Sequence, residues 1–222
     1  MTASFCNPCR AAPALVLCAA LSLGGCAGDN ELDLSSGVGI TATRSLCPAV
    51  GVPVYTGDIT TFDPADSRDA RAIDVVASIT NVRTTCNDLE ARVYVGATFD
   101  VVATRRDAGP ARDVALPYYS SILHGGTAVV AKDESVVNVH FADGQIRGTG
   151  HGTGGAYVDR SALELPADIR ERITRRRRAG DENAALDPLS ETDVRAAVVQ
   201  ATYELLIGFQ LTQDQLQYNV TR

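Results

Sequence analysis

Residue types that often carry out chemistry are few in this chain, and their spacing favours no particular reaction. The three histidines, His124, His140 and His151, show no His-x-x-His or Glu-x-x-His spacing, whereas a catalytic zinc ion typically needs three protein ligands. No Gly-x-Ser-x-Gly motif supplies a nucleophilic serine. We therefore expect no metal, no cofactor and no catalytic residues. A hydrolase that uses His124 or His151 remains the weakest functional alternative.

Glycines alternate with other residues in the segment 148–155, which reads Gly-Thr-Gly-His-Gly-Thr-Gly-Gly. A phosphate-binding loop would need a lysine after its last glycine, and none follows here. If the segment is extended, its even-numbered glycines share one face, and a bare backbone permits close approach of another group. Two interpretations stay open: a strand or loop against which the chain itself packs, or a platform for a ligand.

The N-terminal 25 residues have the pattern of a secretion signal. An uncharged, apolar run of 13 residues, Ala11–Leu23, follows Arg10. It is shorter than the roughly 20 residues of a transmembrane helix, and it is typical of the apolar part of a signal peptide. The end of this run, Leu23-Gly24-Gly25-Cys26, resembles the lipobox of bacterial lipoproteins. The resemblance implies cleavage before Cys26 and attachment of fatty acyl groups such as palmitate to Cys26.

The lipobox has consequences for location and for the other cysteines. Cleavage removes Cys6, Cys9 and Cys18, and with them the only Cys-x-x-Cys motif. In Gram-negative lipoproteins an aspartate directly after the lipidated cysteine usually retains the protein in the inner membrane. Ala27 stands at that position, so the resemblance implies the periplasmic side of the outer membrane. An ordinary cleaved signal with a chance cysteine is the alternative.

Net charge and cysteine count limit the functions and the cysteine chemistry that we expect of the chain after the signal. It contains 19 basic and 27 acidic residues, a net charge of −8, which disfavours nucleic-acid binding because phosphate contacts need basic surface. Besides Cys26 it holds two cysteines, Cys47 and Cys86. In an oxidising compartment an even pair predicts a disulfide. Two free thiols or a metal-binding pair are the alternative.

The pattern of apolar residues predicts a mainly β fold. Residues 26–45 are rich in Gly, Ser and acids and are expected to form a flexible tether, with a root-mean-square span of roughly 25 Å. Residues 46–222 are expected to form one domain. Alternating apolar residues at 73–80 and 91–101 predict strands, and short strands with turns between them favour an antiparallel β-sandwich like immunoglobulin or fibronectin type III domains. Pro117 indicates an edge strand or a bulge.

The region before the final strand breaks the β pattern. We expect a helical excursion at about 161–199, with one amphipathic helix over 166–178 that has acids in its first turn and arginines in its last, as the helix dipole favours. A second helical segment follows over 190–199. Residues 201–211 are expected to form the last and most buried strand, although part of this stretch also fits a helix face.

Arginines form the only basic cluster of the chain. Arginine forks suit phosphate and carboxylate groups, so this cluster is the candidate binding site for an anionic lipid headgroup, a lipopolysaccharide phosphate or an acidic protein face. The alternative is a solvated helix face whose charges pair with nearby acids. The cluster consists of Arg170, Arg172, Arg175, Arg176, Arg177 and Arg178.

These observations predict a non-enzymatic lipoprotein that binds or scaffolds another component of the cell envelope. Its expected partners are membrane lipid, through acylated Cys26, and an envelope protein. The alternative is an inhibitor or ligand-binding module that engages a cationic protein or a small ligand. We expect an exposed apolar patch if the protein is a scaffold and a protruding acidic loop if it is an inhibitor.

Overall fold

The structure is a computed structural model and describes residues 44–178, 180–182 and 184–221; Cys26 and the expected signal and tether lie outside this range, apart from Arg44 and Ser45. The strands are β1 (Ala49–Gly51), β2 (Asp58–Phe62), β3 (Ile73–Asn87), β4 (Arg92–Arg105), β5 (Arg112–His124), β6 (Ala128–Phe141), β7 (Arg147–Asp159) and β8 (Tyr203–Phe209). The helices are α1 (Arg160–Leu163), α2 (Ala167–Thr174), α3 (Thr192–Gln200) and α4 (Gln213–Thr221), with 3-10 turns at Ala70–Ala72 and Pro188–Ser190.

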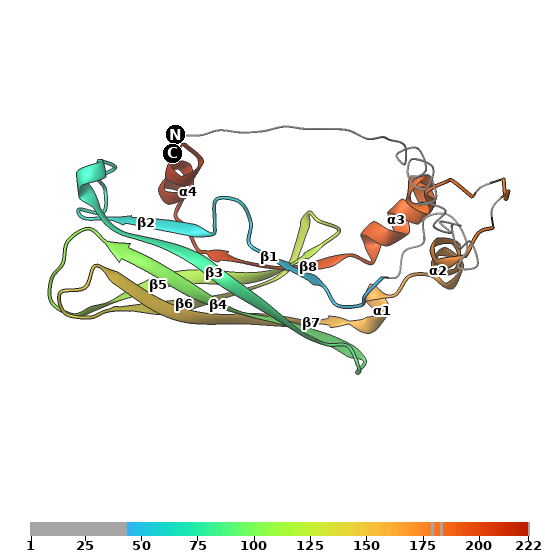
Figure 1. Ribbon diagram of the computed structural model, residues 1–222, viewed down its shortest axis with the longest axis horizontal. Coiled ribbons are helices and arrows are strands. Elements are labelled where there is room, and N and C mark those ends of the chain that lie inside the picture. Colours follow the sequence, from blue (N-terminus) through green and yellow to red (C-terminus); the bar gives the residue numbers. More distant parts are fainter. Residues whose placement is uncertain (1–43, 179, 183, 222) are drawn as a thin grey trace, which may run out of the picture.

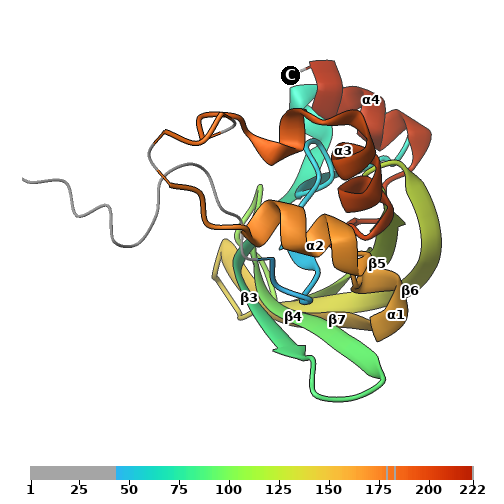
Figure 2. The same cartoon turned by 90° about the vertical axis from the view of Figure 1, so that its right-hand side faces the viewer.

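The strands form one curled, eight-stranded sheet in the order β1-β8-β5-β6-β7-β4-β3-β2, shaped as a half-barrel (Figure 1). The short β1 runs parallel to β8, and all other neighbours are antiparallel. The mainly β prediction is thus confirmed, whereas a two-sheet sandwich is not. The helical excursion lies between β7 and β8 as expected. Its helices gather at one end of the sheet, which we call the helical end (Figure 2).

Two strands follow the sequence pattern closely. In β4 the alternate residues from Val93 to Val101, including Phe99, are buried on the inner face. In β8, Leu205, Ile207 and Phe209 are completely buried, which decides in favour of a strand over a helix for this stretch. Burial of this kind is the main stabilising contribution, at about 25 cal/mol per Å² of apolar surface.

Strand β6 runs without a break through Asp133 and Glu134, which pair with Ser120 and Tyr119 of β5. Two predictions from the sequence were wrong. Helix α2 ends at Thr174, and Arg175 has an extended backbone, so Arg175–Arg178 are not helical. Pro117 lies in a central strand. A proline has no backbone N–H group to donate to a neighbouring strand. Pro117 is tolerated in β5 because the pairing of β5 with β8 stops at Tyr118, one residue before the proline is reached.

The glycine-rich segment forms most of β7 and faces the core. A Cβ atom added to Gly152 would lie 2.2 Å from the Phe99 ring, and one added to Gly150 would lie 2.6 Å from the Asn138 carbonyl oxygen. Phe99 in turn contacts Tyr118 edge to face at 5.1 Å between ring centres. The chain therefore covers its own glycine stripe, and the packing interpretation is the correct one.

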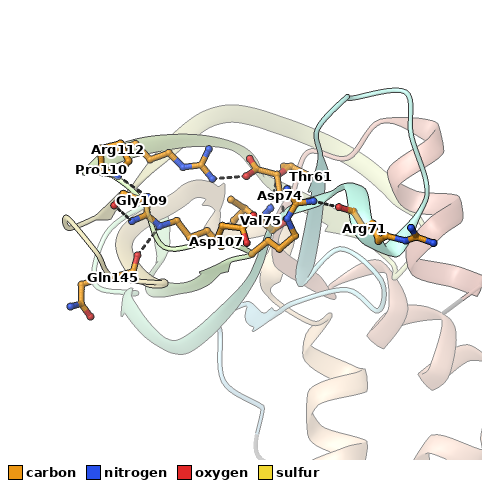
Figure 3. Close-up of polar contacts among 11 residues, drawn as sticks. Thr61, Arg71, Asp74, Val75, Asp107, Gly109, Pro110, Arg112 and Gln145 are labelled. Carbon is orange, nitrogen blue, oxygen red and sulfur yellow. Dashed lines mark hydrogen bonds and ion pairs between the residues drawn. The ribbon is translucent and has the colours of Figure 1, made fainter.

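At the end of the sheet opposite the helical end, Gly109 and Pro110 of one turn lie near Gln145 of another (Figure 3), and a buried arginine joins the two turns. Arg105 is 3% exposed, and its guanidinium donates hydrogen bonds to the carbonyl oxygens of Gln145, Gly109 and Pro110 at 2.7–2.8 Å. These bonds join the β4–β5 turn to the β6–β7 turn. Nearby, the Arg112 guanidinium lies 2.6 Å from the Asp74 carboxylate.

The predicted disulfide between Cys47 and Cys86 is present, with a Cα–Cα distance of 6.0 Å. It ties the segment before β1 to the end of β3, next to the β3–β4 hairpin tip. Among the described residues no helix is both long and apolar enough to cross a membrane.

Candidate binding site at the helical end

Arg44, the first described residue, is fixed against the C-terminal end of α3. Its guanidinium donates hydrogen bonds to the carbonyl oxygens of Val198, at 3.4 Å, and Ala201, and to the Thr202 hydroxyl, at 3.2 Å. A cation at this position is favourable because the helix dipole places partial negative charge at the C-terminus. Burial lowers the pKa of Arg44 from its ordinary value, although the group stays protonated. The chain therefore enters the domain at the helical end.

A hollow of about 330 Å³ opens between this segment, α1 and α2. We call it the arginine-rimmed hollow. Its apolar lining comes from leucines and one isoleucine, and its charged lining from three arginines and one glutamate. The lining residues are Arg44, Leu46, Arg160, Leu163, Glu164, Leu165, Arg170, Ile173 and Thr174.

The local sequence explains how these side chains meet. In α2, Ile169 and Ile173 are buried one turn apart and pack with Val194 of α3, which orients Arg170, adjacent to Ile169, towards the outside. In α1, buried Leu163 joins the core of the sheet, and Arg160 begins the helix directly after β7. The short helix α1 and the extended chain that follows it thus separate Arg160 from Arg170 by the width of the hollow.

The three arginines differ in whether their guanidinium groups already have hydrogen-bond or ion-pair partners in the described residues. Arg44 bonds to the end of α3, and Arg160 donates to the Glu90 carbonyl oxygen at 3.0 Å and lies 3.7 Å from the Glu164 carboxylate. The Arg170 side chain is exposed and has no bonded partner within the described residues. Arg170 is therefore the guanidinium most available to an incoming anion.

The composition of the hollow suits an anionic amphiphile. Three positive groups against one negative group give it a local positive charge in an acidic protein. Guanidinium forks bind phosphate and carboxylate oxygens bidentately, while the leucine lining can remove a short alkyl segment from water. Pockets of this volume with an apolar lining and a few charged groups are typical of ligand sites.

The predicted arginine cluster is only partly brought together. Arg172 lies 2.6 Å from the Asp193 carboxylate and also contacts Glu191, and Arg175 lies 3.0 Å from Glu171. These contacts raise the pKa of Arg172 and lower that of Asp193, in both cases chiefly through the hydrogen bond between the two side chains. Arg172 and Arg175 are thus paired with acids of their own chain.

The rest of the cluster lies along the extended segment after α2. Arg177 donates to the Leu186 carbonyl oxygen, and with Arg172 and Arg175 it lines a second hollow of about 380 Å³ whose wall includes Glu191. The side chains of Arg176 and Arg178 are exposed and have no bonded partner in the described part of the chain. Of the six predicted residues, only Arg170 reaches the arginine-rimmed hollow.

No histidine lines any of the pockets described here. His124 contacts the Gln200 carbonyl oxygen at 2.7 Å and stacks on Tyr203, while His140 lies 2.8 Å from Asp113. His151 lies 2.7 Å from Asp100, which Asn81 also contacts; these two contacts lower the pKa of Asp100. Within the described residues no three His, Cys, Asp or Glu side chains form a metal-binding group.

Arg44 and Arg160 belong to the hollow but could not be identified from sequence spacing, because they are 116 positions apart. The one signal was positional: Arg44 stands where the expected tether meets the domain. Comparison of the chain with protein-family models, with curated proteins and with solved structures finds no match.

Proposed function

We propose that the protein is a lipid-anchored, non-enzymatic binding module of the cell envelope, held at the periplasmic side of the outer membrane through acylated Cys26. Its arginine-rimmed hollow binds the anionic headgroup of an amphiphile. The observation that carries this proposal is the gathering of Arg44, Arg160 and Arg170 around an apolar wall at the end where the chain enters the domain.

The position of the hollow supports the proposal because the hollow lies at the end of the domain to which the expected lipid anchor is connected. Arg44 follows Cys26 by 18 positions, and a flexible chain of that length has a root-mean-square span of roughly 25 Å. An anchor at Cys26 therefore keeps the helical end close to lipid headgroups. A positively charged hollow at that end meets anionic groups at high local concentration.

The test is a calorimetric titration of the full chain, in a mild nonionic detergent, with dihexanoyl phosphatidylglycerol and, separately, with dihexanoyl phosphatidylcholine. We expect the anionic lipid to bind and the zwitterionic lipid to bind much more weakly. Arg170→Gln is expected to weaken binding about tenfold, the value of one charge-assisted hydrogen bond to phosphate.

Arg176→Gln is the matched control, because it removes the same charge from an exposed arginine that does not line the hollow. It should leave the affinity unchanged. Equal binding of the two lipids, or equal losses with Arg170→Gln and Arg176→Gln, would show that the hollow is not the binding site.

A second candidate function is inhibition of a cationic protein, and the β3–β4 hairpin favours it. The hairpin protrudes beyond the sheet at the helical end (Figure 1). Its tip carries Leu89, which is 87% exposed, between Asp88 and Glu90. The disulfide at Cys86 fixes the base of this acidic tip, and rigid loops lose less entropy on binding.

A variant with Leu89→Ser, Asp88→Asn and Glu90→Gln tests this candidate. We expect it to lose inhibition of a cationic muramidase such as lysozyme if the tip is an inhibitory loop, with lipid binding by the hollow retained. Absence of inhibition by the wild-type chain would eliminate this second candidate.

A further inference from the structure

Strand β6 is exposed on both faces over most of its length. All nine residues from Ala128 to Val136 are exposed, including the valines Val129, Val130 and Val136 at 61%, 55% and 53%. On one side β6 pairs with β5, with one irregularity at Val130, which has no registered partner. On the other side, in the part of the chain that the structure describes, its only registered pair with β7 is His140 with Thr149. Val137 packs against Gly150 of β7 and is buried, so the free edge of the strand runs from Ala128 to Val136.

A long free edge with exposed valines is a template for pairing with another strand. We propose that β6 pairs antiparallel with β6 of a second copy of this chain, about a two-fold axis that passes beside Asp133. The charged centre of the edge, Lys-Asp-Glu over 132–134, brings Lys132 of one copy opposite Glu134 of the other in this arrangement.

Charge selects the register. With the axis at Asp133, Lys132 of each copy stands opposite Glu134 of the other, so two ion pairs form on the outer face. Cross-strand pairs of opposite charge stabilise a sheet. A shift of the axis to Lys132 or to Glu134 would remove both ion pairs and place two like charges opposite each other, whereas the axis at Asp133 keeps both ion pairs and has one like-charge contact, between the two Asp133 side chains.

The residues already occupy suitable positions. Lys132 and Glu134 lie on the same face, 2.7 Å apart within one strand, so either can turn to the partner without leaving its face. The same register places Asp133 opposite its own copy, which is the single unfavourable contact.

The test uses the full chain in mild detergent, with mass measured by sedimentation at several protein concentrations. The wild-type chain is expected to double its mass, while Lys132→Glu and Glu134→Lys alone each place like charges opposite one another and raise the dimer dissociation constant by about tenfold or more. The double variant Lys132→Glu/Glu134→Lys should dimerise again, because it exchanges the two charges.

An equimolar mixture of the two single variants provides a control that a folding defect could not imitate. One copy then carries two glutamates and the other two lysines at positions 132 and 134, so the mixture is expected to form a mixed dimer although neither variant dimerises alone. Asp133→Asn should strengthen the wild-type dimer. A wild-type chain that stays monomeric, or a dimer that neither single reversal weakens, would overturn the proposal.

The register has its own test in cross-linking. Asp133→Cys should give a covalent dimer on mild oxidation, since residues opposite each other in an antiparallel pair have Cα atoms about 4.5–5.5 Å apart, within the range of a disulfide. Asp143→Cys, in the exposed turn after β6, should give none. Equal cross-linking at both positions would contradict the register.

Discussion

The Arg105 guanidinium carbon lies 5.4 Å from the centre of the Phe141 ring, so a buried cation stacks on a completely buried aromatic side chain. No carboxylate lies within ion-pair distance of this arginine in the described residues; its hydrogen-bond acceptors are backbone carbonyl oxygens from two separate turns. Arg105 therefore acts as a structural clamp at the end of the sheet opposite the helical end.

Replacement of this clamp should destabilise the fold strongly. Arg105→Met keeps much of the packing but leaves buried carbonyl oxygens without donors, and hydrogen bonds to a charged group contribute about 1.5–3 kcal/mol each. We expect a loss of about 3 kcal/mol in the free energy of unfolding, measured by urea denaturation. Arg147→Met, at an exposed arginine of β7 without a bonded partner in the described range, should change it by less than about 0.5 kcal/mol. Equal effects would contradict the clamp.

The contact between Gly152 and Phe99 gives a second prediction. Gly152→Ala would place a methyl group 2.2 Å from the Phe99 ring, and overpacking of this kind costs about 1–3 kcal/mol. Phe99→Leu in the same chain should recover part of that loss, because the smaller side chain makes room for the methyl group. Gly109→Ala, where the nearest atom outside the neighbouring residues is 3.8 Å away, is the control. Additive losses in the double variant, measured by thermal unfolding, would argue against direct contact.

Removal of the disulfide should weaken the whole domain. Cys47 and Cys86 are 39 positions apart, and closure of a loop of that size contributes about 3–4 kcal/mol in the chain-entropy model. We expect Cys47→Ala/Cys86→Ala to lower the urea midpoint, and a reducing agent to lower the wild-type midpoint by a similar amount. The same reducing agent should leave the double variant unchanged. A wild-type midpoint that does not respond to reduction would contradict this prediction.

The ion pair between Asp193 and Arg172 predicts a dependence of stability on acid pH. The hydrogen bond from Arg172 lowers the pKa of Asp193 in the folded state, so the stability from this pair is present above the unfolded pKa of about 3.9 and is lost as pH falls through the folded value. Asp193→Asn should therefore show a smaller fall in Tm than the wild type below about pH 4. Asp143→Asn, at an exposed carboxylate without a partner among the described residues, should follow the wild type. Identical curves for Asp193→Asn and the wild type would show that the pair contributes nothing.

Features that depend on local sequence could be predicted here. The alternation of apolar residues at 91–101 identified the buried face of β4. The even number of cysteines after Cys26 predicted the disulfide between Cys47 and Cys86. In each case the information lies within a few neighbouring residues or in a simple pairing rule.

Features that depend on contacts between distant segments could not be predicted. The single curled sheet depends on the pairing of β8 with β5. These two strands are far apart in the sequence, with a helical insertion directly before β8, so the pairing cannot be predicted from local sequence. The burial of Arg105 could not be predicted, because two of its carbonyl partners, Ala142 and Gln145, lie about 40 positions away in the chain. The hollow likewise joins Arg44 to Arg160 only after β7 and α1 are placed.

The central claim is that this chain is exported and carries lipid on Cys26, and mass spectrometry of the N-terminus tests it most directly. Trypsin cuts after Arg44, the first basic residue after Cys26. For the full chain produced in a Gram-negative host, the account predicts an N-terminal peptide from Cys26 to Arg44 whose mass includes a diacylglyceryl group and a third acyl chain. A peptide that begins upstream of Cys26, or an unmodified Cys26, would contradict it.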